Sequence, residues 1–210
     1  MSDPSTADVA SMWDSVNPQH AHFRSHVYQE WWDMWVARHR AMIGSLGIEP
    51  ETVLEWGIGG GANASLLPDT QYHGVDVSLR SLGEACRYPH VVVWLHDGDP
   101  RDTLAFVPEV GLFICTAVIQ HMPSHADVEL MLRAAYAKVR PGGRGLVQTR
   151  SLQTRKSSYA EGWQRWVCYS PDRAAALLRS VGWSICERRD VRPDYSYFLL
   201  AKPERANAVA

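Results

Sequence analysis

Short apolar runs alternate with segments of helical spacing along most of this chain. Seven runs rich in β-branched and aromatic residues predict strands over residues 52–57, 71–77, 91–96, 111–116, 144–150, 183–191 and 195–203. Between them, apolar positions at helical spacing predict helices over residues 61–67, 79–88, 125–139 and 170–182, with Ser124 or Asp127 as a possible N-cap and Gly182 as a terminator. Such alternation is typical of βαβ units and a parallel sheet.

The end of the chain follows a different pattern, because its last two predicted strands have no helix between them. Only "RPD" separates residues 183–191 from residues 195–203, so these strands should pair antiparallel. We therefore expect an α/β fold: a Rossmann-like three-layer sandwich with a mostly parallel seven-stranded sheet and an antiparallel last strand.

Residues 1–50 differ in character from the rest. A helical pattern with aromatic residues on more than one side runs from about residue 25 to 46, and "GIEPET" breaks it before the first strand. We expect an N-terminal helical lid at residues 1–50 and one compact domain at residues 51–205. The aromatic residues of this segment either line a pocket or pack its helices onto the core.

The stretch "VLEWGIGGGANASLL" places four glycines within five residues, directly after a predicted strand. Glycines there let the chain turn sharply and let a ligand touch the backbone at the carboxyl edge of the sheet. Asp76 closes the next strand, where a carboxylate can accept hydrogen bonds from both hydroxyls of a ribose. Turn and acid together predict an adenosine-containing ligand.

A glycine-rich turn after a strand can also bind phosphate groups, in a P-loop or in a dinucleotide site. No GK[ST] follows the glycines, which excludes a P-loop, but Gly57, Gly59 and Ala62 fit the dinucleotide pattern G-x-G-x-x-A. Glu55 discriminates between the remaining ligands. Its carboxylate would repel a pyrophosphate but suits a ligand with an ammonium group.

With these features in view, the chain resembles the class I S-adenosylmethionine-dependent methyltransferases over most of residues 50–203. "LEWGIGGGAN" is similar to the first motif of that family and "GVDVS" to the second, which carries the ribose-binding acid. "HDGDPRDT" is similar to the adenine-binding stretch, "FICTAVIQHMP" to the fourth motif and "VRPGGRGLVQT" to the fifth strand and the turn before it.

The resemblance implies S-adenosyl-L-methionine as the cofactor. The positions expected to face its methionyl part, with Glu55 directed at the ammonium, are Glu55, Gly57, Gly59, Gly61, Thr116 and Ala117. Those expected to face its ribose and adenine are Asp76, Val77, Asp97 and Gly98. Arg24 either pairs with the cofactor carboxylate or is solvated.

The resemblance also implies methyl transfer to an O or N atom of a small metabolite or natural-product intermediate. His121 is the candidate base, although it could instead orient a loop. Residues 149–169 interleave basic and aromatic side chains, which would clamp an anionic or aromatic substrate or form a solvated loop. The substrate-binding candidates are Tyr28, Trp31, Arg150, Tyr159, Trp163 and Trp166.

Two rival functions remain open. One is an NAD(P)-dependent oxidoreductase, which Glu55 and the antiparallel last strands disfavour. The other is a non-methylating S-adenosylmethionine-binding protein on the same fold.

Composition and net charge limit the classes of partner that we expect. Of the 210 residues, 46% are hydrophobic and 21% charged, with a net charge of −2, so we expect no nucleic-acid or membrane partner. The four cysteines are dispersed, and the histidines lack a zinc motif, so we expect neither disulfides nor a metal. The first residues lack signal-peptide character, which predicts a cytoplasmic protein, either a monomer or a homodimer.

Overall fold

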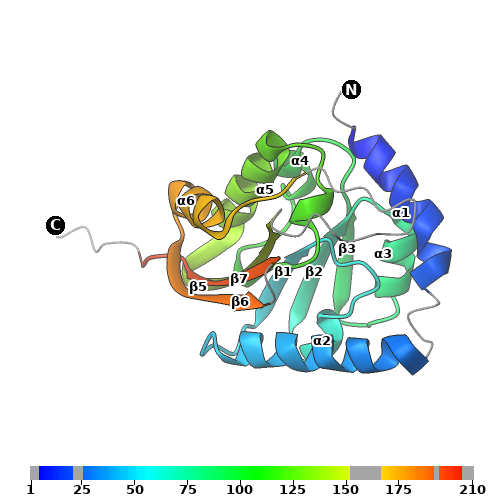
Figure 1. Cartoon of the computed structure of the whole chain (residues 1–210), viewed down its shortest axis with the longest axis horizontal. Coiled ribbons are helices and arrows are strands. Elements are labelled where there is room, and N and C mark those ends of the chain that lie inside the picture. Colours follow the sequence, from blue (N-terminus) through cyan, green and yellow to red (C-terminus); the bar gives the residue numbers. More distant parts are fainter. Residues whose placement is uncertain (1–4, 21–25, 152–166, 192–193, 205–210) are drawn as a thin grey trace.

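A seven-stranded sheet forms the centre of the computed structural model, which describes residues 5–20, 26–151, 167–191 and 194–204 (Figure 1). Its order is β3-β2-β1-β4-β5-β7-β6. The strands are β1 (Thr52–Trp56), β2 (Gln71–Asp76), β3 (Val91–Leu95), β4 (Val110–Cys115), β5 (Val139–Arg150), β6 (Ser184–Val191) and β7 (Tyr195–Ala201). β1 to β5 run parallel, and β7 lies antiparallel to both β5 and β6. The predicted α/β architecture is confirmed.

Helices cover both faces of this sheet, which makes three layers (Figure 1). They are α1 (Thr6–His20), α2 (His26–Gly44), α3 (Leu79–Ala85), α4 (Pro100–Thr103), α5 (His125–Lys138) and α6 (Pro171–Val181). Ser124 caps α5 by accepting a hydrogen bond from the backbone of Asp127, and Gly182 ends α6, in agreement with the sequence prediction.

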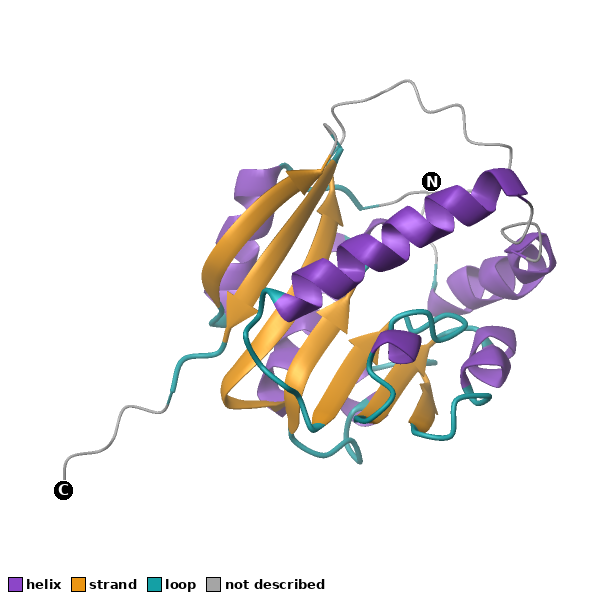
Figure 2. Cartoon of the chain, turned by 90° about the horizontal axis from the view of Figure 1, so that it is seen from below, coloured by secondary structure: helices purple, strands orange, loops and turns teal. Residues whose placement is uncertain are grey.

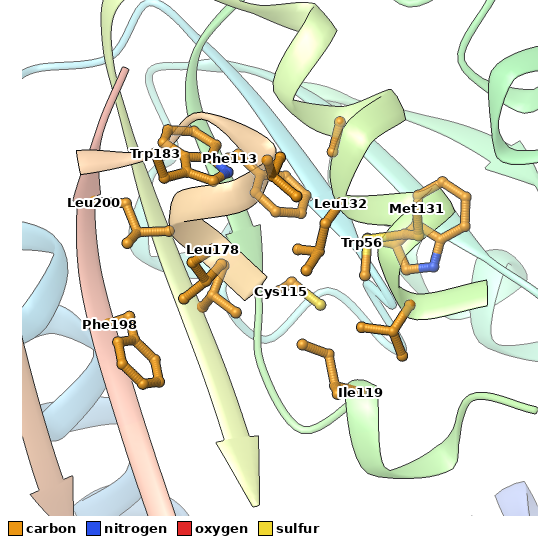
Figure 3. Packing of buried hydrophobic residues seen from close by; sticks show 14 of the residues in the cluster. Trp56, Phe113, Cys115, Ile119, Met131, Leu132, Leu178, Trp183, Phe198 and Leu200 are labelled. Carbon is orange, nitrogen blue, oxygen red and sulfur yellow. The ribbon is translucent and has the colours of Figure 1, made fainter. Parts of the chain in front are cut away.

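The larger buried cluster lies between the sheet and α5 and α6 (Figure 3). Phe113 of β4, Leu132 of α5 and Leu178 of α6 are almost fully buried there, and Trp183 stacks on Phe113. Each such side chain stabilises the fold by roughly 1.5–3 kcal/mol through removal from water. This cluster fixes the strand ends that carry the candidate site.

The opposite face of the sheet is covered by α2 and α3, and α2 lies across the strands in Figure 2. His39, Met42 and Ile43 are buried, and their spacing of three and four residues puts them on one side of α2, while Leu46 is buried in the turn that follows. The two helices of residues 1–50 therefore have different positions. This part of α2 belongs to the layer that covers one face of the sheet, whereas α1 packs against α3.

The prediction of a helix over residues 61–67 is wrong. The structure has turns followed by one 3₁₀ turn, Ala64–Leu66, and the chain re-enters the sheet at β2. Pro68 disfavours a helical conformation at Leu67, whose φ and ψ are −131° and 60°. α4 was not predicted from the sequence, and α1 lies within the predicted helical segment of residues 1–50, in which no helix bounds were predicted before residue 25.

Candidate active site

The glycine turn at the carboxyl edge packs directly against the segment that follows β4. Gly57 has φ 79°, and a Cβ there would lie 2.0 Å from Cγ2 of Val118. Gly57 also donates its backbone N–H to the carbonyl oxygen of Val75 at 2.7 Å. Only glycine combines this backbone angle with this close approach. The turn is thereby joined to the ends of β2 and β4.

Gly59 marks the open side of the turn. It has φ 53°, and a Cβ there would meet no atom within 4 Å. Its backbone N–H donates to Oδ2 of Asp76 at 2.9 Å, while Oδ1 of Asp76 accepts from the backbone of Ser78 at 2.9 Å. Burial raises the pKa of Asp76. Each carboxylate oxygen can accept a further hydrogen bond, so Asp76 can shape the turn and still accept from a ligand.

Glu55, at the end of β1, is 2% exposed. Its Oε1 accepts a hydrogen bond from Nδ2 of Asn63 at 2.6 Å, and its Oε2 accepts one from the hydroxyl of Tyr72 at 2.7 Å. Burial raises the pKa of Glu55 to about 8, against the opposing effect of these two donors, and Asp76 adds to the rise.

Asn63 connects this acid to α2 and was missed by sequence reasoning. Its Nδ2 also donates to Oγ1 of Thr116 at 3.2 Å, and its Oδ1 lies 2.8 Å from Nδ1 of His39. Burial lowers the pKa of His39 to about 4, so the imidazole is neutral near pH 7. Because Oδ1 of Asn63 can only accept a hydrogen bond, Nδ1 carries the proton of the neutral imidazole and donates to it. The sequence signal was an asparagine two residues after the last glycine of the turn.

The other expected cofactor positions lie at the ends of β2, β3 and β4. Val77 is half-buried after β2, whereas Asp97 and Gly98 are exposed after β3. Thr116 is 5% exposed. Ala117 has φ 61°, uncommon for a residue with a side chain, and its N–H donates to Oε1 of Gln148 at 2.9 Å.

His121 lies in the 3₁₀ turn Ile119–His121 and is 5% exposed. Trp13 of α1 meets its ring edge-on, with centroids 5.0 Å apart. Asp14, the next residue of α1, accepts a hydrogen bond from the hydroxyl of Ser78 at 2.6 Å. Through Trp13 and Asp14, α1 contacts the segments that follow both β4 and β2.

The structure describes the side chain of one candidate substrate-binding residue, Arg150, but not those of the others. Arg150 is 5% exposed; its Nη2 pairs with Asp194 at 2.8 Å and its Nη1 donates to the hydroxyl of Tyr195 at 2.8 Å. Tyr28 and Trp31 lie on α2, but the structure describes only their backbone. Three more substrate candidates, Tyr159, Trp163 and Trp166, lie outside the described residues, as does the cofactor candidate Arg24.

Two further buried polar groups occur in this region and were not predicted from the sequence. Gln120 and Thr149 are 4% and 3% exposed, and neither Oε1 of Gln120 nor Oγ1 of Thr149 has a hydrogen-bond partner in the described part of the chain. Gln120 belongs to the 3₁₀ turn that packs on β5, and Thr149 lies near the end of β5. Unsatisfied buried groups cost about 1–3 kcal/mol each.

Neither a metal centre nor a membrane span occurs in the described part of the chain. Within 5–20, 26–151, 167–191 and 194–204, no three His, Cys, Asp or Glu side chains gather as metal ligands. In the same ranges no helix has the length and apolar character needed to cross a bilayer.

Comparison with known proteins relates this geometry to a fold. No protein-family model and no curated protein matches the chain. Several solved structures do match it in fold. The [4+2]-cyclase SpnF superposes with a TM-score of 0.72 at 14% identity, covering 97% of this chain and 99% of that one.

Methyltransferases superpose as well. The CcbJ methyltransferase from Streptomyces caelestis gives a TM-score of 0.64 at 15% identity, covering 78% of this chain and 88% of its own. Human N-acetylserotonin methyltransferase, in complex with SAM, gives 0.60 at 18% identity, covering 86% and 57%. With its strand order and its antiparallel β7, the chain has the fold of the class I S-adenosylmethionine-dependent methyltransferases.

Proposed function

We propose that this protein binds S-adenosyl-L-methionine at the carboxyl edge and transfers its methyl group to an O or N atom of a small metabolite or natural-product intermediate. One observation carries the proposal. An open glycine turn stands between two carboxyl groups, Glu55 and Asp76, at the ends of adjacent strands.

The residues present fit this cofactor. The open space at Gly59 would take its methionyl part against bare backbone, and the free acceptor capacity of Asp76 suits ribose hydroxyls. Glu55 would face the ammonium, which a pyrophosphate-bearing dinucleotide lacks. Gly57, Gly61, Thr116 and Ala117 would offer backbone to the same end of the molecule, and Val77, Asp97 and Gly98 would contact its adenine.

When bound, the cofactor supplies an activated methyl group on a positively charged sulfur. The protein has to align the acceptor and exclude water. We infer that α1 forms the lid, because Trp13 contacts His121 and Asp14 binds Ser78. His121 would accept a proton from the acceptor as it is methylated.

The two unpartnered groups, Gln120 in the turn that carries His121 and Thr149 on β5, support a polar acceptor. A substrate hydroxyl or amine could donate to Oε1 of Gln120, and the hydroxyl of Thr149 can donate or accept. Such a substrate would relieve the cost of leaving these atoms unpaired. Arg150 already pairs with Asp194, which weakens its role as a clamp for an anion.

Calorimetry with S-adenosylmethionine and with NAD tests the proposal. We expect binding of S-adenosylmethionine alone, and Asp76→Ala should weaken it more than tenfold. Asp69→Ala, which removes an exposed carboxylate in the turn before β2, is the matched control and should bind normally. Binding of NAD alone, or unchanged affinity in Asp76→Ala, would contradict the proposal or the ribose assignment respectively.

A second candidate function follows from the likeness to SpnF, whose printed name is that of a [4+2]-cyclase. The chain could bind the same cofactor without transferring its methyl group. A panel of small phenols, acids and amines, incubated with S-adenosylmethionine carrying an isotopically labelled methyl group, distinguishes the two. Label in a product supports methyl transfer, whereas cofactor binding without labelled product favours the second candidate.

A further inference from the structure

The carboxyl group of Glu55 is positioned by the protein but not neutralised by it. Asn63 and Tyr72 each donate one hydrogen bond to it, one to each carboxyl oxygen. Within the described part of the chain, no lysine, arginine or histidine forms an ion pair with Glu55. A buried carboxylate without a cation is costly, so such a group keeps its proton instead.

The groups that surround Glu55 do not supply positive charge. Asp76 of the neighbouring strand β2 raises its pKa, and the hydroxyl of Tyr72 and the thiol of Cys115 both stay protonated because burial raises their pKa values. His39 of α2 reaches Glu55 only through Asn63 and is neutral near pH 7. From β1, β2, β4 and α2, Glu55 therefore faces neutral or acidic groups.

We propose that Glu55 binds the ammonium of the methionyl ligand by releasing its own proton to solvent, and that Asn63 and Tyr72 are the positioning residues that hold the resulting carboxylate. The inference rests on the proposed function. The O–H bond of the carboxyl group breaks, the proton passes to water or buffer, and the ammonium keeps its protons in the ion pair that forms.

The amount of proton released follows from the charge balance. With a pKa of about 8, Glu55 is largely protonated at pH 6.5, and an ammonium at contact distance lowers that pKa. Binding at pH 6.5 should therefore release nearly one proton, and the release should decline as the pH passes about 8. At pH 6.5 an α-amino group is already an ammonium, so the ligand itself takes up little.

Isothermal titration calorimetry in buffers of different ionisation enthalpy measures this number. S-adenosylhomocysteine is the probe, and 5′-methylthioadenosine, which shares the adenosine but lacks the amino-acid part, is the control ligand. We expect release of close to one proton with the first and close to none with the second.

Tyr72→Phe tests the positioning role with little change in volume. Loss of the hydroxyl removes one donor to the carboxylate, so the pH at which proton release falls to half should rise by roughly half a unit or more. Tyr136→Phe is the matched control, because its hydroxyl donates to the carbonyl of Gly182, far from Glu55 in the chain and on another element. It should leave the profile unchanged.

The outcomes separate the two proposals. Equal proton release for both ligands, or the same pH profile in Tyr72→Phe as in the wild type, would overturn this inference and leave cofactor binding standing. Failure of S-adenosylhomocysteine and S-adenosylmethionine to bind at all would overturn both.

Discussion

Ala117 shows at the scale of one residue how tightly the carboxyl edge is constrained. Its φ of 61° lies in the left-handed region, where a side chain costs roughly 1–2 kcal/mol, and its N–H is held by Gln148. Strain of this kind gathers at ligand-binding positions. Here it turns the backbone after β4 at a position that we assign to the methionyl part of the cofactor.

Ala117→Gly should therefore stabilise the protein, by about 0.5–1 kcal/mol in chemical denaturation, because glycine adopts this angle freely. The matched control is Ala176→Gly, at an exposed position in α6, which should destabilise by about 1 kcal/mol. Destabilisation of both variants alike would show that the backbone angle at Ala117 is not strained.

His121→Ala should lower turnover while cofactor affinity stays the same. A general base contributes roughly 10²–10⁴-fold to a rate, so steady-state kinetics and calorimetry together test the assignment. His125→Ala, at an exposed histidine at the start of α5, is the control. Full activity of His121→Ala would leave His121 with the alternative role of orienting the turn after β4.

Residue types explain which parts of the site could be predicted. Glu55, Gly57 and Asp76 stand beside strand ends, where local sequence is enough to suggest contact with a ligand. His39 could not be found this way, because its bond to Asn63 depends on α2 crossing the sheet face beneath the turn. Contacts between distant segments leave no local pattern.

At the scale of elements, the parallel strands follow from apolar runs, since buried parallel strands need apolar residues on both faces. The structure of the segment after the glycine turn could not be predicted in the same way. Residues 61–67 have apolar positions at helical spacing, but Pro68 disfavours a helix there. The face that this segment leaves uncovered is occupied by α2, whose buried residues Met42 and Ile43 pack with Ile58 and Tyr72. Tertiary packing here outweighs a local helical pattern.

Asp14 is the residue through which α1 reaches the turn after β2. Asp14→Asn should weaken the hydrogen bond that this side chain accepts from the hydroxyl of Ser78, which also caps α3. Amide hydrogen exchange across residues 6–20 should become faster, and S-adenosylhomocysteine should dissociate several-fold faster, as expected for a loosened lid. Asp69→Asn is the control for an exposed carboxylate. Unchanged exchange and dissociation would remove α1 from the role of lid.

At the scale of the whole molecule, His39 and Glu55, two buried titratable groups linked through Asn63, affect stability in opposite directions. For His39, the native pKa of about 4 lies below the ordinary 6.5, so the unfolded state binds the extra proton and stability rises with pH between those values. For Glu55, the native pKa of about 8 lies above the ordinary 4.5, so the native state binds the extra proton and stability falls as pH rises across that window. Between about pH 4.5 and 6.5 these two contributions largely cancel.

Above pH 6.5 the contribution of His39 no longer changes with pH whereas that of Glu55 does, so the free energy of unfolding should fall with pH until about pH 8, at up to roughly 1.4 kcal/mol per pH unit. Urea denaturation from pH 6.5 to 9 measures this slope. Glu55→Gln should flatten it, because the glutamine does not titrate, and saturating S-adenosylhomocysteine should also flatten it by holding Glu55 ionised in the native state. A wild-type curve that is flat between pH 6.5 and 8 would mean that Glu55 is ionised in the free protein, with a cation already beside it.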